Sequence, residues 1–192
     1  MTKIVRARHI RGNANKPGSR GRIQIGLMVE ARDSAGKLTG VYKNALDLGT
    51  KALAQLIQNN IFDTAETVTD TSNTGRALTV NSACTVPMVV AGTGTTAAAF
   101  ADYALTTIAT GGTYGGSNSS GNQAATINAI SSNTFTVTAT ITNTSGSTIT
   151  YAEVGMACTS ATFTFLLAHD VFTGLAVSNN GTLAVTYTLT FT

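Results

Sequence analysis

The chain has 192 residues, of which 43% are hydrophobic and 11% charged, and its formal net charge is +3. A chain of this length buries roughly 70% of its extended surface as one domain, so it needs no metal or disulfide framework to fold. No apolar run approaches the roughly 20 residues of a membrane-spanning helix, and the N-terminus lacks the apolar core of a signal peptide. We therefore expect one domain that is made in a cytoplasm and does not enter a membrane.

The first 22 residues form a basic segment. They hold seven of the twelve Lys and Arg residues, and no acid precedes Glu30. The Gly, Asn, Pro and Ser residues between them cannot pack a core, which favours a flexible arm. A basic arm suits nucleic acid or an acidic protein surface, and a solvated tail is the alternative; without aromatic residues, base stacking is not indicated. The candidate contacts to a polyanion or partner are Lys3, Arg6, Arg8, Arg11, Lys16, Arg20 and Arg22.

Residues 23–60 predict a β-hairpin followed by a helix. Apolar residues alternate from Ile23 to Val29, Asp33–Gly36 supplies a four-residue turn, and Lys37–Tyr42 supplies the second strand. In Asn44–Asn59 the apolar residues fall at helical spacing instead. We expect the one substantial helix of the chain there, ending at its Asn pair.

Residues 61–192 predict a β-sandwich that forms one globular domain with residues 23–60. A polar loop is expected over Phe62–Asn81 with a strand at its end, one short helical turn over Ala97–Leu105, and a flexible or partner-ordered loop over Gly111–Asn122. Further strands are expected at Thr85–Ala91, Ala124–Ile130, Thr134–Asn143, Thr148–Cys158, Thr162–Ala168 and Thr182–Thr192. The predicted fold class is mainly β, an antiparallel sandwich of jelly-roll type with one helix and a basic N-terminal arm.

Threonine occupies one face of two predicted strands. Every even position of Thr134–Thr144 is Thr, and in Thr182–Thr192 Thr alternates with Leu, Val, Tyr and Phe. Beyond Arg76 the chain has no Lys or Arg and only three acids. A free cytosolic domain usually carries charge on such a face for solubility. We therefore expect neighbouring subunits to cover the threonine face.

Few residues suggest chemistry. His169 and Asp170 are the only His and acid pair in the β region, and adjacent residues on a strand point to opposite faces. Because no base, nucleophile and oxyanion set converges on them, we expect a polar pair at a strand end or subunit contact, and no catalytic residues. Gly92–Ala97 formally matches the dinucleotide-binding pattern, but the helix behind it is too short, so a tight turn is expected.

The two cysteines, Cys84 and Cys158, give neither a disulfide framework nor metal-ligand spacing. Two small buried apolar residues are the default expectation, and pairing stays open. No cluster of His, Cys, Asp or Glu has the spacing of a metal site, so no metal and no cofactor are predicted.

Motifs in both halves of the chain resemble structural proteins of tailed bacteriophages. The first half carries Asn44–Ile57, then Val89–Ala97 with Asp102–Leu105 behind it. The second half carries Thr140–Gly146, Glu153–Met156, Asp170–Phe172 and Leu183–Leu189 in that order. The resemblance covers roughly Asn44–Thr192, without the basic arm, and implies a virion β-sandwich that assembles and does not catalyse. It does not separate capsid, minor capsid, decoration and tail roles.

The leading hypothesis is a non-enzymatic virion structural protein. It would assemble with itself or with a capsid or tail lattice, and its basic arm would contact a neighbouring subunit or packaged nucleic acid. The alternative is a receptor-binding or adhesin module of the phage surface, with Gly111–Asn122 and Ser178–Gly181 as recognition loops. A hydrolase or nucleotide-binding enzyme built around His169 and Asp170 is the third class.

Overall fold

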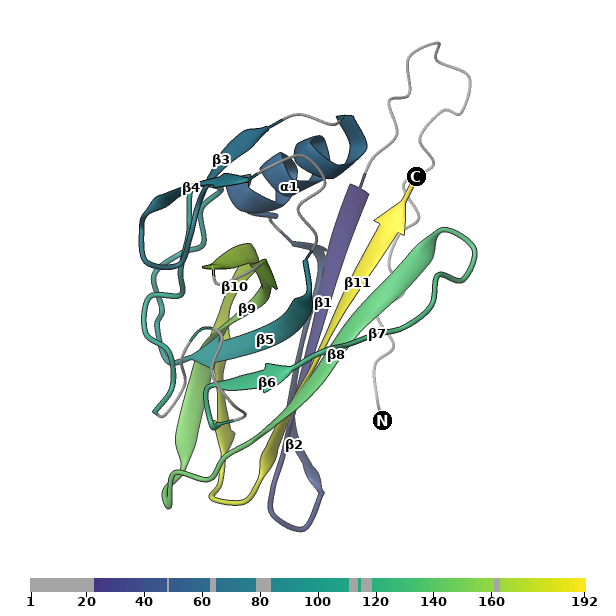
Figure 1. Ribbon diagram of the computed structural model, residues 1–192. Helices are drawn as coiled ribbons and strands as arrows, with labels where there is room; N and C mark the ends of the chain where they lie inside the picture. Colours follow the sequence, from purple (N-terminus) through teal and green to yellow (C-terminus); the bar gives the residue numbers. More distant parts are fainter. Residues whose placement is uncertain are drawn as a thin grey trace.

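The structure is a computed structural model of the whole chain, and it describes residues 23–47, 49–62, 65–78, 84–110, 114, 119–160 and 163–192. Two antiparallel sheets pack against each other, and one helix with a small hairpin lies at one end of the sandwich (Figure 1). The five-stranded sheet has the order β2-β1-β11-β8-β7 and the four-stranded sheet the order β10-β9-β5-β6. The predicted mainly β, antiparallel fold with one helix is therefore confirmed, but the strand order does not establish a jelly roll.

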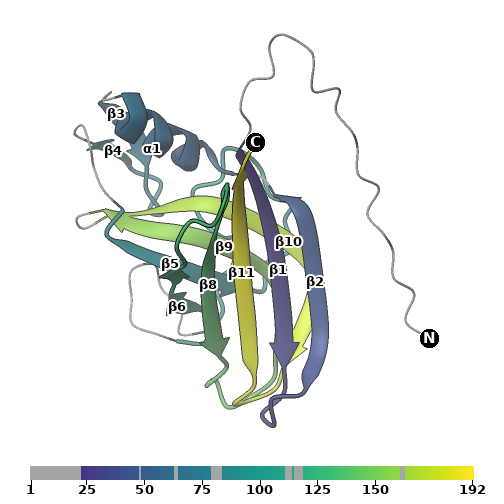
Figure 2. The same cartoon turned by 90° about the vertical axis from the view of Figure 1, so that its right-hand side faces the viewer.

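The five-stranded sheet is built from strands that bury one face. Its strands are β1 (Ile23–Arg32), β2 (Leu38–Asp47), β7 (Thr126–Ile127), β8 (Thr134–Thr142) and β11 (Thr182–Phe191). Alternate residues of β1 and β11, such as Val29 and its partner Val185, are fully or nearly fully buried and point at the other sheet. Period-two alternation of apolar and polar residues produces such a sheet, and Figure 2 shows its long strands side by side.

The four-stranded sheet is covered on both faces. It contains β5 (Val86–Gly92), β6 (Asn122–Ala124), β9 (Ile149–Ser160) and β10 (Phe163–Val177). One face joins the main core, and a second, smaller core of Met88, Val90, Leu105, Ala157 and Leu166 lies on the other. Because β9 is covered on both sides, nearly all of its residues are buried, which explains its long, weakly alternating sequence.

Strand β10 closes one side of the sandwich. Its pairing with β9 shifts register between Leu166 and Ala168 and again between Val171 and Leu175. Extra residues of this kind bend a strand. The bent strand lies against β2 of the opposite sheet, so the two sheets meet along this side.

Helix α1 (Lys51–Phe62) covers one end of the sandwich. Its buried residues Ala52 and Leu56 face the core. The backbone before it is fixed to β10, because Thr50 N donates to Leu167 O at 2.9 Å and the Thr50 hydroxyl donates to Leu166 O. A hairpin of β3 (Glu66–Thr69) and β4 (Gly75–Leu78) follows, and its turn is held by the Asp70 carboxylate, which accepts from Ser72 N and Thr74 N.

Several predicted boundaries were wrong. The segment before Asp47 belongs to β2, because pairing with β1 outweighs its helical spacing, and the helix runs past the Asn pair. The loop predicted over Phe62–Asn81 contains the β3–β4 hairpin. Ala97–Leu105 forms turns and bends without a helical turn. The hairpin of β1 and β2, the turn at Asp33 and strands β8, β9 and β11 are confirmed. Strand β10 continues to Val177, well past its predicted end at Ala168, and the strand predicted over Ala124–Ile130 is divided between β6 and β7.

Candidate functional site

The threonine face lies on the outside of the five-stranded sheet, over β8 and β11. Register pairing places the even residues of the two strands opposite each other, so that four Thr–Thr pairs and one Thr–Ala pair form a ladder. The pairs are Thr142 with Thr182, Thr140 with Ala184, Thr138 with Thr186, Thr136 with Thr188 and Thr134 with Thr190. Each of these ten side chains is half-buried or exposed. Their apolar neighbours on the strands lie on the inner side and are buried, except for the half-buried Phe135 and the exposed Phe191. We call these ten residues the threonine face.

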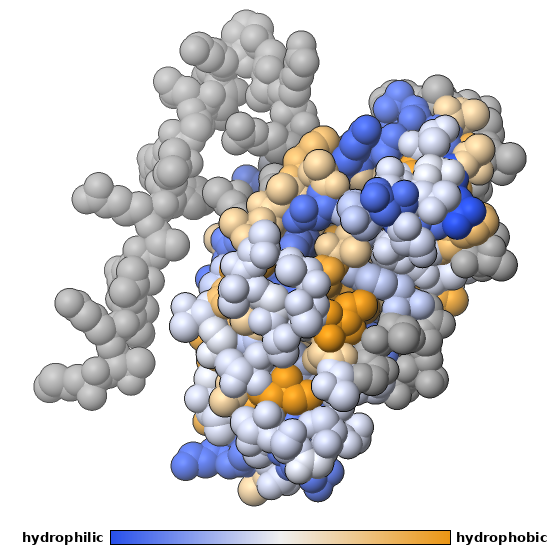
Figure 3. Space-filling view, turned by 90° about the vertical axis from the view of Figure 1, so that its left-hand side faces the viewer, coloured by the Kyte–Doolittle hydropathy of each residue, from blue (hydrophilic) through white to orange (hydrophobic). Residues whose placement is uncertain are grey.

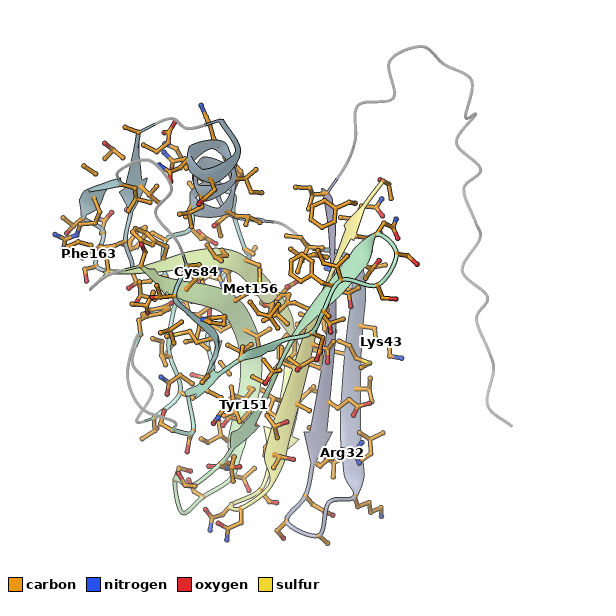
Figure 4. All side chains as sticks on the ribbon, turned by 45° about the vertical axis from the view of Figure 1, so that its right-hand side comes forward. Arg32, Lys43, Cys84, Tyr151, Met156 and Phe163 are labelled. Carbon is orange, nitrogen blue, oxygen red and sulfur yellow. A yellow bond between two sulfur atoms is a disulfide. The ribbon has the colours of Figure 1, made fainter. Side chains whose placement is uncertain are left out.

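Charge on the outer side of this sheet lies at its other edge. Glu30 of β1 and Arg32 form an ion pair at 3.0 Å, and Lys43 of β2 is exposed beside them (Figure 4). Glu30 pairs in register with Ala184, so the charged edge adjoins the threonine face directly. Strands β8 and β11 contain no charged residue. The outer surface is thus divided into a charged half and a hydroxyl-bearing half.

Figure 3 shows the side of the molecule opposite to the one that faces the viewer in Figure 2. In the side view of Figure 3, hydrophobic residues appear as separate small groups among hydrophilic and intermediate ones.

A buried ionic cluster lies under the segment that follows β5. His169 of β10 places Nδ1 at 2.6 Å from Asp102 Oδ2 and Nε2 at 3.1 Å from Glu153 Oε2. Glu153 of β9 is fully buried, and it also accepts the backbone N–H groups of Gly94, Thr106 and Thr107 at 2.7–3.0 Å. One carboxylate thus fixes both ends of the 94–107 segment onto the four-stranded sheet.

The electrostatics of this cluster favour an ion triad. Burial alone would raise the pKa of Glu153, but the His169 ring and the three backbone amides outweigh it and hold that pKa below its ordinary value. Burial alone would lower the pKa of His169, but the two carboxylates raise it. The two carboxylates therefore favour the protonated form of His169, an imidazolium that donates to both.

This arrangement offers no general base. Both ring nitrogens of His169 face carboxylates, so neither has a lone pair to accept a proton from a nucleophile. Asp170 points to the opposite face of β10, where its Oδ1 accepts from Asn44 Nδ2 at 3.3 Å. Its neighbour His169 lies within the strand and is buried, so the expected strand-end location of the pair was wrong. Among the described residues, no group of three His, Cys, Asp or Glu side chains could hold a metal ion.

Gly92 and Gly94 let the backbone approach this ionic cluster closely. A Cβ atom at Gly94 would collide with the Glu153 carboxylate and with Thr106. The glycine pattern therefore allows close approach of the backbone to a carboxylate, where the dinucleotide pattern would hold a phosphate. Asp102 and Glu153 were missed as members of a site, although with Asp170 they are the only acids after Asp70, which was the signal that marked them.

Cys84 and Cys158 form a disulfide with a Cα–Cα distance of 5.6 Å. The default expectation of two unpaired buried residues was therefore wrong. Cys158 is buried in β9, whereas Cys84 is exposed just before β5. The two cysteines come together because β5, the strand that follows Cys84, pairs with β9, which contains Cys158. No local sequence pattern predicts this pairing.

The seven basic candidates, Lys3, Arg6, Arg8, Arg11, Lys16, Arg20 and Arg22, lie outside the described residues. The predicted loop Gly111–Asn122 is described only at residue 114 and from residue 119 onward. The other candidate loop, Ser178–Gly181, is the turn between β10 and β11, closed by Gly181 N donating to Ser178 O at 2.9 Å.

No family model, no curated protein and no solved structure matches the chain. In the described parts of the chain, no helix is both long and apolar enough to cross a membrane.

Proposed function

We propose that this protein is a non-enzymatic structural component of a virion, which assembles through the threonine face with copies of itself or with a capsid or tail lattice. The observation that carries this proposal is the ladder of four Thr–Thr pairs on two neighbouring strands without any charged residue. The resemblance of Asn44–Thr192 to tailed-bacteriophage structural proteins supplies the virion context.

The proposal depends on the free energy needed to desolvate the threonine face at an interface. Burying a charged side chain at an interface requires a partner charge, whereas a threonine brings a methyl group and a hydroxyl that pairs readily with another hydroxyl or a backbone group. Thr134 and Thr190 already exchange such a bond across the ladder, at 3.2 Å. β-Branched side chains also lose little rotamer freedom when covered. A regular row of threonines is therefore inexpensive to desolvate.

Size shows which neighbouring residues must take part. Strands β8 and β11 have nine and ten residues and together span roughly 30 Å by 10 Å, an area below the roughly 800 Å² per partner of a stable interface. A stable contact must therefore extend over adjacent surface. The charged edge at Glu30, Arg32 and Lys43 adjoins the ladder and would orient the partner.

The receptor-binding alternative receives no support from the described loop residues. Tyr114 would be its aromatic platform, but the Tyr114 hydroxyl accepts the backbone N–H of Leu105 and the ring packs on the second core. Burial raises the pKa of this hydroxyl, as expected for a side chain turned inward.

Light scattering behind size exclusion tests the proposal on the full chain. We expect a defined multimer, and we expect Thr138→Lys with Thr186→Lys to reduce it to monomer, because the two residues are opposite each other and would place like charges together. Ser145→Lys, at an exposed turn, is the matched control and should leave the mass unchanged. If the double variant assembles like the unaltered chain, the threonine face is not the interface.

If the unaltered chain is a monomer, it does not assemble with itself, and only assembly with a capsid or tail lattice remains as its function. Saturable binding to assembled capsids or tails, abolished by the same double variant and not by Ser145→Lys, would then be required. Absence of that binding would contradict the proposal as a whole.

A further inference from the structure

The two sheets diverge at the end where α1 lies, and apolar side chains line the space between them (Figures 1 and 4). A cleft of about 180 Å³ extends there from Leu53 of α1 to Phe135 and Leu189 of the five-stranded sheet, and to the Cys84–Cys158 bond on the other sheet. All eleven lining residues are apolar or disulfide-bonded. A second hollow of about 160 Å³ shares Leu53 and continues along α1 to Ile23 and Phe100.

The rim of this space is apolar as well. Ile23, Phe100 and Ile127, which line the cleft or the hollow, are 41%, 51% and 55% exposed. Phe191 stacks on Phe135 with ring centroids 6.0 Å apart and is itself 44% exposed. Scattered single apolar residues are normal on a surface, but a group around an apolar cleft indicates a surface that something covers.

The 22 residues that precede Ile23 are joined to the chain beside this space. Ile23, the first described residue, lies on the wall of the hollow, so residues 1–22 are attached at its rim. Their apolar side chains are concentrated at the start, in Ile4, Val5 and Ile10. The turn-forming residues Gly12, Asn13, Pro17, Gly18 and Gly21 lie between these and the rim. At about 3.3 Å per extended residue, the segment from Ile4 to Ile23 reaches roughly 60 Å, which is ample for a reversal.

We propose that the N-terminal arm folds back over its own chain and places Ile4 and Val5 in the apolar cleft between the sheets. Attachment at the rim gives these residues a local concentration on the order of mM, well above that of a second copy at micromolar concentration. The cations that follow, Arg6 and Arg8, remain at the rim, because their long stems let the charged ends stay in water. The inference concerns the isolated chain, so it does not depend on the proposed assembly.

Photo-crosslinking tests the position of the arm directly. A diazirine-bearing amino acid in place of Val5 should crosslink to peptides that contain Leu53, Ile127 or Phe135. Equal mixing of isotopically heavy and light full-length chains identifies the donor of the arm. We expect crosslinked peptides of a single isotope. Mixed-isotope products would assign the cleft to the arm of a second copy, and absence of cleft peptides would remove the arm as occupant; either result overturns the proposal.

Binding of the dye 1-anilinonaphthalene-8-sulfonate gives an independent measurement. The double variant Ile4→Ser with Val5→Ser should raise dye fluorescence several-fold, because the cleft becomes open to the dye. The control Arg6→Ser with Arg8→Ser alters the same arm without altering its apolar residues and should leave the fluorescence unchanged. Equal fluorescence of the two double variants, with unaltered circular dichroism, would contradict the proposal.

Discussion

His169 Nδ1 lies 2.6 Å from Asp102 Oδ2, although 67 residues separate the two along the chain. The other ring nitrogen faces Glu153, so a single imidazolium joins a loop acid to a strand acid. Glu153 also accepts three backbone N–H groups of the segment after β5, so the triad holds that segment on the four-stranded sheet.

Stability should depend on pH on both sides of a plateau. The pKa of His169 is raised from its ordinary value near 6.5, so its contribution is complete below pH 6.5 and is lost as pH rises through the raised pKa. The pKa of Glu153 is lowered from 4.5, so its contribution is complete above pH 4.5 and is lost as pH falls through the lowered pKa. Urea unfolding from pH 3 to pH 9 should therefore show a maximum between about 4.5 and 6.5. His169→Gln should flatten the alkaline limb; an unchanged limb would contradict an ionised His169.

Glu153→Gln should lower the free energy of unfolding by about 3 kcal/mol or more, because it removes one partner of a buried ion pair. The new amide also presents its NH₂ group to backbone donors that now point at a carboxylate. The matched control is Glu30→Gln, which breaks the part-exposed pair with Arg32 and should cost less than about 1 kcal/mol. Equal losses in chemical denaturation would show that burial of the triad is unimportant.

Gly94→Ala should destabilise the protein by roughly 1–3 kcal/mol, because the added Cβ collides with the Glu153 carboxylate. Gly26→Ala is the control: its nearest neighbour would be Asn44 O at 3.5 Å, an ordinary contact, so its effect should be small. Thermal unfolding of both variants makes the comparison. A tolerated Gly94→Ala would mean that the segment does not approach Glu153 this closely.

Reduction of the Cys84–Cys158 bond should lower stability by about 2–5 kcal/mol, because the bond closes a loop of 74 residues in the unfolded chain. For a chain of this size the melting temperature should fall by roughly 10 °C. The double variant Cys84→Ser with Cys158→Ala should melt at the lower temperature with and without reductant. If reductant leaves the melting temperature of the unaltered chain unchanged, that result would argue against the disulfide bond.

The basic arm gives a separate prediction for nucleic acid. If all seven cations contact phosphates, the logarithm of affinity should fall with the logarithm of salt concentration with a slope of about −6. Filter binding of the full chain between 50 and 200 mM salt measures this slope. Arg6→Gln with Arg8→Gln should reduce its magnitude by about 2. A flat salt response would leave a protein surface as the partner of the arm.

The sequence predicted the strands well because period-two alternation is a local signal. It located β1, β8 and β11 to within one or two residues, together with the Thr-bearing side of β8 and β11. It misplaced the start of the helix because Ala45 favours a helix and Leu46 falls at helical spacing, whereas the pairing of Asn44 and Asp47 with β1 is a contact that no local pattern expresses.

The ionic triad could not be predicted from the sequence either, because it also depends on contacts between distant segments. Asp102, Glu153 and His169 come from a loop and two strands, and only a bulge in β10 aligns His169 with Gly155, two residues from Glu153. Their isolation in an otherwise uncharged region was visible, but their meeting point depends on register. The disulfide between Cys84 and Cys158 depends on the same three-dimensional pairing.

Strand β1 pairs with β11 along all ten of its residues, from Ile23 opposite Phe191 to Arg32 opposite Thr182. The earliest and the latest described strands are thus neighbours in the centre of one sheet. During synthesis the hairpin of β1 and β2 is complete at Asp47, whereas its central partner β11 begins only at Thr182. The apolar inner face of the hairpin stays exposed to water until β11 has been synthesised. The nascent chain therefore depends on chaperones or on rapid translation, which the folded protein does not need.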